Sequence, residues 1–334
     1  MRARRLVSIA PEQMTVEEYE LGESAPTGLV LVRAGVTAVS AGTEVANYLG
    51  LTKNRQADLN KPYYPGYSFA GLVISVGEGV TGFNPGDRVC GMVNHVSHGF
   101  VDPTRIAPIP EGVTDEQAAM STLGIIVLNA VRKPGIQLGE SIAVVGAGLI
   151  GQLASQLARL SGGRPVVSLD FLTARRELAA KNGADAALDP KDPGTSVALQ
   201  HLAPDGFNVV FEASGSNQAV NPAIKLAGRG GRVVLLGSTR GLVDQFDAYG
   251  DVHLKGLTVI GAHITTHMEA PNIANPWTQR ANRRVILDLI RRGELNVDLL
   301  ISHRVAPSEA QEIYAHLAHN QSDFFGVIFD WSKF

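Results

Sequence analysis

The hydrophobic pattern of the chain changes near residue 120. Before that point, short β-rich runs such as Val30–Ala34 and Leu72–Val76 are separated by turn signals, among them Pro85-Gly86-Asp87. Short apolar runs bounded by glycine, proline and aspartate are typical of antiparallel strands joined by tight turns. The first third of the chain is therefore expected to form a barrel-like antiparallel β structure.

After that point, short apolar runs alternate with segments of helical spacing. The β-rich runs are Ser141–Val145, Pro165–Leu169, Val209–Glu212, Arg232–Gly237 and Leu257–Gly261. Apolar residues at helical spacing fill Leu149–Leu160, and Thr173–Asn182 follows as a second helical run. Such alternation predicts a parallel, doubly wound sheet with right-handed crossovers.

The end of the chain has a third character. Gln279–Arg292 and Ser308–Leu317 predict helices, and Phe324–Asp330 predicts a closing strand. We therefore expect an α/β protein in which a Rossmann-type doubly wound parallel sheet is inserted into a discontinuous β-barrel domain. The inserted domain is expected at residues 119–266, and the outer domain at residues 1–118 plus 267–334.

Composition narrows the class of protein. Of the 334 residues, 45% are apolar and 18% are charged, a balance typical of globular proteins. The net charge of −3 argues against a nucleic-acid partner, because binding to phosphates needs an excess of basic side chains. Apolar stretches such as Leu123–Leu128 are far shorter than the roughly 20 residues that span a bilayer, so no membrane association is expected. The single cysteine, Cys90, excludes an internal disulfide and favours a buried structural residue in a cytoplasmic protein.

Glycine is enriched, with 36 residues, and three glycines form a G-x-G-x-x-G pattern between an expected strand and an expected helix. Gly146 permits a tight turn, Gly148 lets the backbone approach a pyrophosphate, and Gly151 allows the helix to pack closely on the strand. The N–H groups at the start of the helix, around Leu149 and Ile150, are expected to bind that pyrophosphate.

Asp170 ends the next expected strand, about 20 residues after the glycines, where an acidic side chain binds the ribose hydroxyls of a dinucleotide. The alternative role is a helix cap, because a helical run follows. A carboxylate there would repel the 2′-phosphate of NADP by about 4 kcal/mol, for two unit charges about 4 Å apart at an effective dielectric constant near 20. NAD(H) is therefore the expected cofactor; Arg175 and Arg176 could offset part of the repulsion, which leaves NADP(H) open.

Five stretches carry a resemblance to a known family. They are Ala41-Gly42-Thr43-Glu44, Pro65-Gly66-Tyr67-Ser68-Phe69-Ala70-Gly71, Gly82-Phe83-Asn84-Pro85-Gly86-Asp87-Arg88-Val89, the Gly146 pattern, and Phe211-Glu212-Ala213-Ser214-Gly215. Together they resemble the medium-chain dehydrogenase/reductase superfamily, in its zinc alcohol dehydrogenase-like group, over nearly the whole chain. Ser40–Glu44, Pro65–Tyr67 and Phe325–Trp331 look most like a subgroup near bacteriochlorophyllide dehydrogenase and threonine dehydrogenase-like proteins.

The resemblance implies an oxidoreductase with a GroES-like catalytic domain around the Rossmann sheet. It also implies a homodimer, formed by edge pairing of the nucleotide-binding sheets near Leu257–Gly261. Ser214, Gly237 and Ser238 follow expected parallel strands and should face the cofactor crevice. His263 follows the last strand of the sheet, where the family binds the nicotinamide carboxamide.

The chain departs from the family at the catalytic zinc. The family's cysteine, histidine and glutamate are replaced by Ala41, Tyr67 and Ser68, and the later ligand position falls near Ser121-Thr122. A catalytic zinc needs about three protein donors of imidazole, thiolate or carboxylate type. The cysteine-rich lobe for a structural zinc is absent from the sequence. A zinc-independent member is therefore expected.

Without zinc, hydrogen-bond donors must polarise the substrate oxygen. Thr43 corresponds to a hydroxyl that contacts the substrate oxygen in zinc relatives; its alternative role is to cap a loop. Tyr67 should point into the cleft and donate to a carbonyl, or it fills the vacated space. Ser40 is a further candidate, Glu44 is an acid behind the site or a solvated carboxylate, and His98 is a cleft-lining donor.

Two histidine pairs have metal-like spacing, His95 with His98 and His263 with His267. Pairs of this kind are common by coincidence, and no further ligand stands near them, so no metal site is expected. The preferred function is a zinc-independent transfer of hydride between nicotinamide and a small organic alcohol, carbonyl or activated alkene. The rivals are a dinucleotide-binding protein without catalysis and a zinc enzyme with rearranged ligands.

Overall fold

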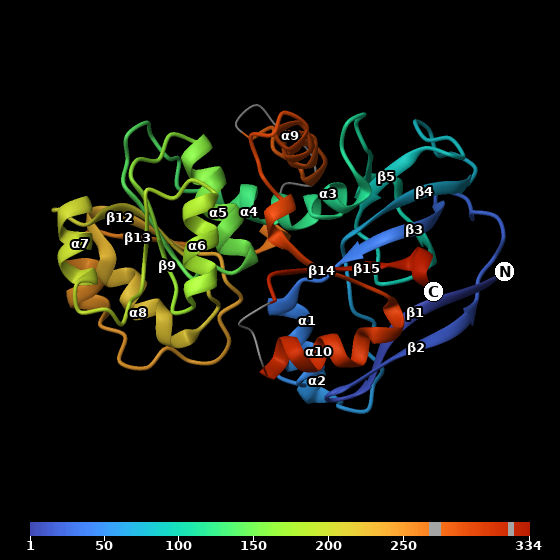
Figure 1. Cartoon of the computed structure of the whole chain (residues 1–334), viewed down its shortest axis with the longest axis horizontal. Coiled ribbons are helices and arrows are strands. Elements are labelled where there is room, and N and C mark those ends of the chain that lie inside the picture. Colours follow the sequence, from blue (N-terminus) through green and yellow to red (C-terminus); the bar gives the residue numbers. More distant parts are fainter. Residues whose placement is uncertain (267–274, 320–323) are drawn as a thin grey trace. The chain divides into compact units, whose positions relative to one another are not determined.

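The computed structural model describes residues 1–266, 275–319 and 324–334. The chain divides into two compact units (Figure 1). The first unit is Met1–Ile125 with Met268–Phe334, and the second is Ile126–His267. The first is dominated by antiparallel strands and the second by a parallel sheet with helices, which confirms the expected α/β class. The domain limits expected from the sequence stay a prediction. His267, which is paired with His263 by its spacing, lies outside the described residues.

The first unit contains a two-stranded and a seven-stranded sheet. β1 (Arg2–Ala10) pairs antiparallel with β2 (Gln13–Glu20). The larger sheet has the order β14-β15-β3-β4-β5-β7, with β6 paired to β3. Its strands are β3 (Val30–Ala38), β4 (Phe69–Val76), β5 (Arg88–Gly91), β6 (His98–Val101), β7 (Ile106–Pro108), β14 (Ile301–Val305) and β15 (Gly326–Asp330). β14 and β15 pair in parallel and the other neighbours are antiparallel.

Alternation of side chains along these strands builds the core of the first unit. Val32, Phe69, Val73 and Val89 are buried together with Trp331 from the end of the chain. Each such side chain contributes about 1.5–3 kcal/mol by leaving water. The strands expected at 30–34 and 72–76 are confirmed as parts of β3 and β4. Cys90 is a buried free thiol, as expected.

Helices cover the sheets of the first unit. They are α1 (Ala41–Tyr48), α2 (Lys53–Ala57), α3 (Asp115–Ala119), α9 (Gln279–Arg291) and α10 (Ala310–His319). α4 (Ser121–Arg132) follows α3 and contains the boundary between the units. The two helices and the closing strand expected near the end of the chain are confirmed as α9, α10 and β15.

The second unit has a fully parallel six-stranded sheet with the order β10-β9-β8-β11-β12-β13. Its strands are β8 (Ile142–Val145), β9 (Val166–Leu169), β10 (Ala186–Leu188), β11 (Phe207–Glu212), β12 (Ala227–Leu235) and β13 (Thr258–Gly261). The helices between them are α5 (Leu149–Leu160), α6 (Thr173–Lys181), α7 (Thr195–Leu202) and α8 (Asn217–Leu226). The strand order reverses between β8 and β11, and ligands of such sheets bind beyond the carboxyl ends of the strands at that point.

Several elements were not predicted individually. Among them are the helix α1, the helix α4, which contains the apolar run Leu123–Leu128, and the strand β10. The α1 sequence contains Gly42, Thr43 and Val45, which are poor helix formers. Its first turn is held instead by Glu44, whose Oε1 accepts a 2.7 Å hydrogen bond from the backbone N–H of Ser40. Tertiary contacts therefore override local propensity there.

In the part of the chain that the structure describes, no helix combines the length and apolar character needed to cross a membrane.

Candidate active site

The glycine-rich turn of the second unit connects β8 to α5. Gly146 has a φ of +93°, a left-handed conformation that glycine adopts at little cost. A Cβ on Gly146 would lie 2.8 Å from the Ser214 backbone, so the turn lies directly against the loop that follows β11. A Cβ on Gly151 would lie 1.8 Å from the carbonyl oxygen of Gly146, so α5 starts in direct contact with the turn.

No side chain caps the start of α5. Its N-cap residue is Gly148, and a Cβ added there would meet only the Arg175 guanidinium, at 3.7 Å or more. The N–H groups of the first turn, including those of Leu149 and Ile150, have no acceptor within the helix. The positive end of the helix dipole adds to their attraction for an anion. The N–H groups expected to bind the pyrophosphate are therefore not capped by a side chain.

Asp170 lies at the carboxyl end of β9, with 7% of its surface exposed. Its Oδ2 accepts a 2.8 Å hydrogen bond from the N–H of Ala147, inside the glycine turn. Its Oδ1 accepts from the N–H of Leu172 at 2.9 Å. The N-cap of α6 is Leu172, so Asp170 does not occupy the cap position. A carboxylate offers about four lone-pair positions, so Asp170 retains acceptors for ribose hydroxyls.

The two arginines near Asp170, Arg175 and Arg176, differ in their hydrogen-bond and ion-pair partners. Arg176 donates to the carbonyl oxygens of Asp170 and Phe171 and pairs with Asp189 at 3.1 Å. Arg175 lies over the turn, with its Nη1 3.6 Å from Asp170 Oδ2. Its Nε is buried and finds no hydrogen-bond acceptor within the described residues. Arg175 is therefore the cation that faces the turn.

A buried carboxylate organises the neighbouring strand ends. Glu212, the last residue of β11, is fully buried, and its Oε1 accepts from the N–H of Ser214 at 2.8 Å and from the Ser214 hydroxyl. Its Oε2 accepts from the Thr239 hydroxyl at 3.2 Å, and its carbonyl accepts from the N–H of Gly237 at 2.7 Å. One side chain thus fixes the loops that carry Ser214, Gly237 and Ser238.

His263 follows β13 and is exposed. Its Nδ1 lies 2.8 Å from the Thr265 hydroxyl, and its carbonyl accepts from the Thr266 hydroxyl. These two hydrogen bonds hold His263 in a turn just beyond the last strand of the sheet. Contact between His263 and a cofactor stays a prediction.

The first unit brings Ser40, Glu44 and Tyr67 together. Ser40 is the N-cap of α1, and its hydroxyl accepts a hydrogen bond from the Tyr67 hydroxyl. Thr43 lies half-buried in the first turn of the same helix, with its N–H 3.1 Å from the Ser40 carbonyl. The three hydroxyl candidates and the acid therefore lie around one helix end.

Glu44 is fully buried, and His95 is its main partner. His95 Nε2 lies 2.9 Å from Glu44 Oε2, and its Nδ1 lies 2.7 Å from the Thr37 hydroxyl. The hydroxyl of Tyr314, on α10, donates to the same Glu44 oxygen. Burial alone would raise the pKa of Glu44, but His95 and the hydrogen bonds from Tyr314 and Ser40 outweigh it and hold that pKa below its ordinary value. Glu44 is therefore an ionised carboxylate and not a solvated surface acid.

His98 does not join this cluster. It pairs with Arg33 across β3 and β6, and its Nδ1 lies 3.2 Å from the Ser97 hydroxyl. Partial burial and the charge of Arg33 lower the pKa of His98. His95, three residues earlier, is fully buried, whereas His98 is only partly buried. The structure gives no geometric support to a catalytic role for His98.

The four positions expected for a zinc ion do not offer its usual donors. Ala41 supplies a methyl group, Tyr67 is bonded to Ser40, and Ser68 supplies a hydroxyl. Ser121 Oγ lies 2.8 Å from the guanidinium of Arg283, a fixed positive charge that would repel a metal cation. Within residues 1–266, 275–319 and 324–334, no three histidine, cysteine or acidic side chains converge as a metal-ligand group. The residues present do not fit zinc.

The sequence interpretation missed three residues of these sites. His95 was noted only for its spacing from His98, whereas the fold pairs it with Glu44. Tyr314 lies 270 residues from Glu44 in the chain, so no local pattern could connect them. Glu212 did carry a signal, because a carboxylate at the end of an apolar strand needs several partners once it is buried.

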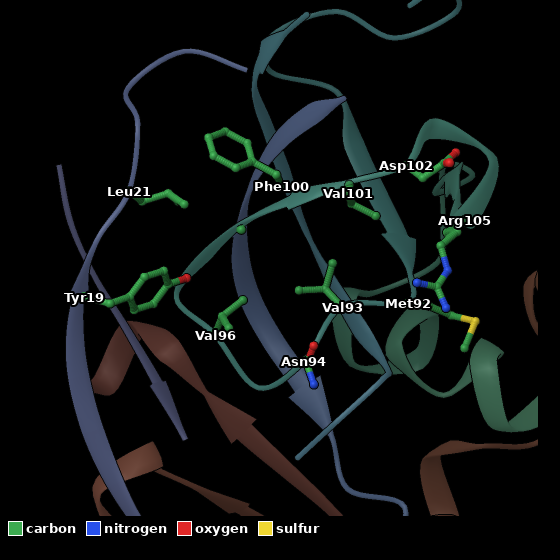
Figure 2. Close-up of a pocket in the computed structure, with 11 residues that line it drawn as sticks. Tyr19, Leu21, Met92, Val93, Asn94, Val96, Phe100, Val101, Asp102 and Arg105 are labelled. Carbon is green, nitrogen blue, oxygen red and sulfur yellow. The ribbon is translucent and has the colours of Figure 1, made fainter. Parts of the chain in front are cut away.

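A separate cavity of about 360 Å³ lies beside the segment that carries His95 (Figure 2). Its walls combine apolar side chains with polar ones, and Asp102 and Arg105 lie at one edge. Asn94 and Val96 line it from either side of His95, whose own ring reaches Glu44. None of the candidate catalytic residues lines this cavity.

Comparison with known proteins agrees with the fold. Residues 26–104 match a family model described as the alcohol dehydrogenase GroES-like domain, and residues 150–280 match one described as zinc-binding dehydrogenase. D-guloside 3-dehydrogenase of Escherichia coli K12 is 25% identical, over 98% of this chain and 100% of its own length. L-threonine 3-dehydrogenase of Legionella pneumophila strain Corby is 26% identical, over 99% of each chain.

A solved structure shows the same fold over the full length. It is described as a short chain alcohol dehydrogenase (rspB) from Escherichia coli CFT073 in complex with NADH. The two structures have a TM-score of 0.83 at 19% sequence identity, covering 99% of each chain.

Proposed function

This chain belongs to the medium-chain dehydrogenase/reductase superfamily, in the zinc alcohol dehydrogenase-like group, and from that premise we propose a zinc-independent oxidoreductase that transfers a hydride between nicotinamide and a small organic alcohol or carbonyl. The chain is an NAD(P)-dependent dehydrogenase. The observation that carries the proposal is the glycine turn with Asp170 hydrogen-bonded into it, at the carboxyl ends of β8 and β9. Bound there, NAD(P) supplies the hydride chemistry.

The residues of the second unit account for cofactor binding. The uncapped start of α5 receives the pyrophosphate, and Asp170 accepts hydrogen bonds from the adenosine ribose. Glu212 holds the loops that carry Ser214 and Gly237 beside the turn. The negative charge of Asp170 favours NAD(H), and Arg175 limits but does not reverse that preference, since it lies 3.6 Å from the same carboxylate.

The Tyr67 and Ser40 hydroxyls of the first unit together supply a hydrogen-bond donor for the substrate oxygen. The Tyr67 hydroxyl donates a hydrogen bond to Ser40 Oγ, which leaves the Ser40 O–H free to donate a hydrogen bond to a substrate oxygen. A preorganised donor of this kind stabilises the negative charge that develops on a carbonyl oxygen. Thr43 stands one turn away on the same helix end as a second donor. Glu44 positions the pair through the Ser40 backbone N–H.

Zinc-independence is supported by the donor set. The side chains at the expected ligand positions are a methyl group, a phenol and hydroxyls, and a guanidinium lies against the last of them. The curated relatives are named as dehydrogenases of a guloside and of threonine, both of which carry hydroxyl groups. This favours the interconversion of an alcohol and a carbonyl over the reduction of an activated alkene.

A homodimer is proposed through β13. This strand is at the edge of the parallel sheet, and Val259 at its centre is 42% exposed. An exposed apolar edge strand is a ready partner for a second copy. A cytoplasmic location stays a prediction from cysteine usage.

The test is a titration with NADH and NADPH, followed by a screen of alcohols with NAD and a metal analysis. We expect saturable NADH binding, NADPH binding at least about tenfold weaker, turnover of an alcohol, and no stoichiometric zinc. Binding without turnover of any alcohol or carbonyl would favour a non-catalytic dinucleotide-binding protein. One zinc per chain, with activity lost on its removal, would overturn the zinc-independent mechanism.

A further inference from the structure

Arg283, on α9, is a buried cation. It is 3% exposed, and its Nη1 donates to the hydroxyls of Ser121 at 2.8 Å and Thr122 at 3.0 Å. No carboxylate lies within ion-pair distance of it among the described residues. An arginine in a protein stays protonated, and a buried charge without a counter-charge is unfavourable.

Helix packing holds the guanidinium in this place. Gly124 and Ile286 are in van der Waals contact that leaves no room for a side chain, since a Cβ on Gly124 would lie 2.7 Å from Ile286 Cγ2. Ser121 lies three residues before Gly124 on α4, and Arg283 lies three residues before Ile286 on α9. Residues three apart share a helix face, so this contact fixes Arg283 over Ser121.

The surrounding groups do not neutralise the charge. Cys90 Sγ lies 3.5 Å from Ser121 Oγ, and burial raises the pKa of the Cys90 thiol more than Arg283 lowers it, so the thiol stays neutral. Asp115 acts on the cluster from a distance, but its Oδ1 is paired with Arg88 at 2.5 Å.

A second buried donor faces the same side of the sheet. Ser68 is fully buried, and its hydroxyl has no hydrogen-bond partner in the described part of the chain. Ala70 pairs with Cys90 across β4 and β5, and side chains two residues apart in a strand lie on one face. Carried one residue beyond the start of β4, this alternation assigns Ser68 to the same face as Ala70 and Cys90.

We infer that this cluster is a binding site for the carboxylate of a small molecule, held by the Arg283 guanidinium and the hydroxyls of Ser121 and Ser68. The planar guanidinium matches a carboxylate in two parallel hydrogen bonds. The bound carboxylate supplies the missing counter-charge and an acceptor for the unpartnered hydroxyl. The site lies within the first unit and does not depend on the proposed function.

The experiment uses formate as the probe and formamide as its uncharged counterpart, with the full-length protein. Formate should raise the thermal unfolding temperature saturably, and formamide should not. Arg283→Met should weaken formate binding at least about tenfold, because a charge-assisted hydrogen bond is lost. Arg284→Met is the matched control, since Arg284 is the next residue of α9 and is exposed; it should respond as the wild type does.

Ser121→Asp keeps the test decisive if Arg283→Met does not fold. An internal carboxylate should raise the unfolding temperature and abolish the formate response. Equal effects of formate and formamide, an unchanged formate response in Arg283→Met, or a destabilised Ser121→Asp that still binds formate would each overturn the inference. Failure of the wild type to bind NADH would count against the proposed function and leave this result intact.

Discussion

At the scale of single residues, Asp170 and Arg175 place opposite charges beside one glycine turn. Asp170→Asn removes the negative charge and keeps the shape of the side chain. NADH affinity is expected to fall about tenfold, as for loss of a charged hydrogen bond, while the ratio of NADPH to NADH affinity rises. Nicotinamide fluorescence measures both. Asp189→Asn is the control, because Asp189 pairs with Arg176 away from the turn; an unchanged ratio in Asp170→Asn would refute the ribose role.

A change in the Tyr67–Ser40 pair should affect the chemical step and leave cofactor binding unchanged. Tyr67→Phe removes the hydrogen bond that orients the Ser40 hydroxyl and should lower kcat/KM by up to about a hundredfold, the effect of losing one donor to a developing oxyanion. The Kd for NADH should not change, because the glycine turn belongs to the other unit. Tyr64→Phe is the control, since the Tyr64 hydroxyl is bonded to Arg5. Equal activity of the two variants would exclude Tyr67 from the reaction.

Glu44 predicts an acid-sensitive fold. Its pKa is depressed in the folded protein, so it contributes stability above the ordinary value of 4.5, and that contribution is lost as the pH falls below it. Chemical unfolding at pH 6 and at pH 3.5 should show a smaller loss of stability on acidification in Glu44→Gln than in the wild type. The same loss in both proteins would mean that another carboxylate governs acid unfolding.

His95 and Glu44 form a buried pair, and the cost of breaking it is high. His95→Ala leaves the carboxylate without its partner and should lower the free energy of unfolding by about 3 kcal/mol or more. His98→Ala, on a partly buried ring outside the cluster, should cost much less. Denaturant unfolding of the two variants checks the difference.

At the scale of elements, the three glycines before and within α5 have different tasks. A Cβ on Gly151 would lie 1.8 Å from the Gly146 carbonyl, so Gly151→Ala should disrupt the turn and destabilise the second unit. A Cβ on Gly148 would meet only the Arg175 guanidinium, at 3.7 Å or more, so Gly148→Ala should fold normally. It should nevertheless bind NADH at least about tenfold more weakly, because the pyrophosphate must approach this backbone. Thermal unfolding and NADH titration separate the two effects.

At the scale of the whole molecule, β13 predicts the oligomeric state. Light scattering should give the mass of two chains, and Val259→Lys at the edge strand should shift the protein towards one chain, because edge lysines block strand pairing. Val197→Lys is the control, since Val197 on α7 is 71% exposed and away from this edge. A wild-type protein with the mass of one chain would contradict the proposed homodimer.

The sequence by itself determined the parallel sheet, the glycine turn and Asp170, because periodicity and turn chemistry act over short stretches of chain. α5 spans the residues that its spacing predicts, and the strands β8, β9 and β11 end where their apolar runs end. Local rules could not predict α1, whose weak helix formers are held by a hydrogen bond that the backbone N–H of Ser40 donates to the Glu44 carboxylate.

Tertiary structure alone decided which polar groups meet once they are buried. His95 finds Glu44 across 51 residues, Tyr314 reaches it across 270, and Arg283 reaches Ser121 across 162. Each of these contacts depends on the packing of segments that lie far apart in the sequence. Spacing along the sequence reveals only the period of a helix or strand. Burial and long-range pairing hold Glu44 as a carboxylate, and they leave the guanidinium of Arg283 without a counter-charge.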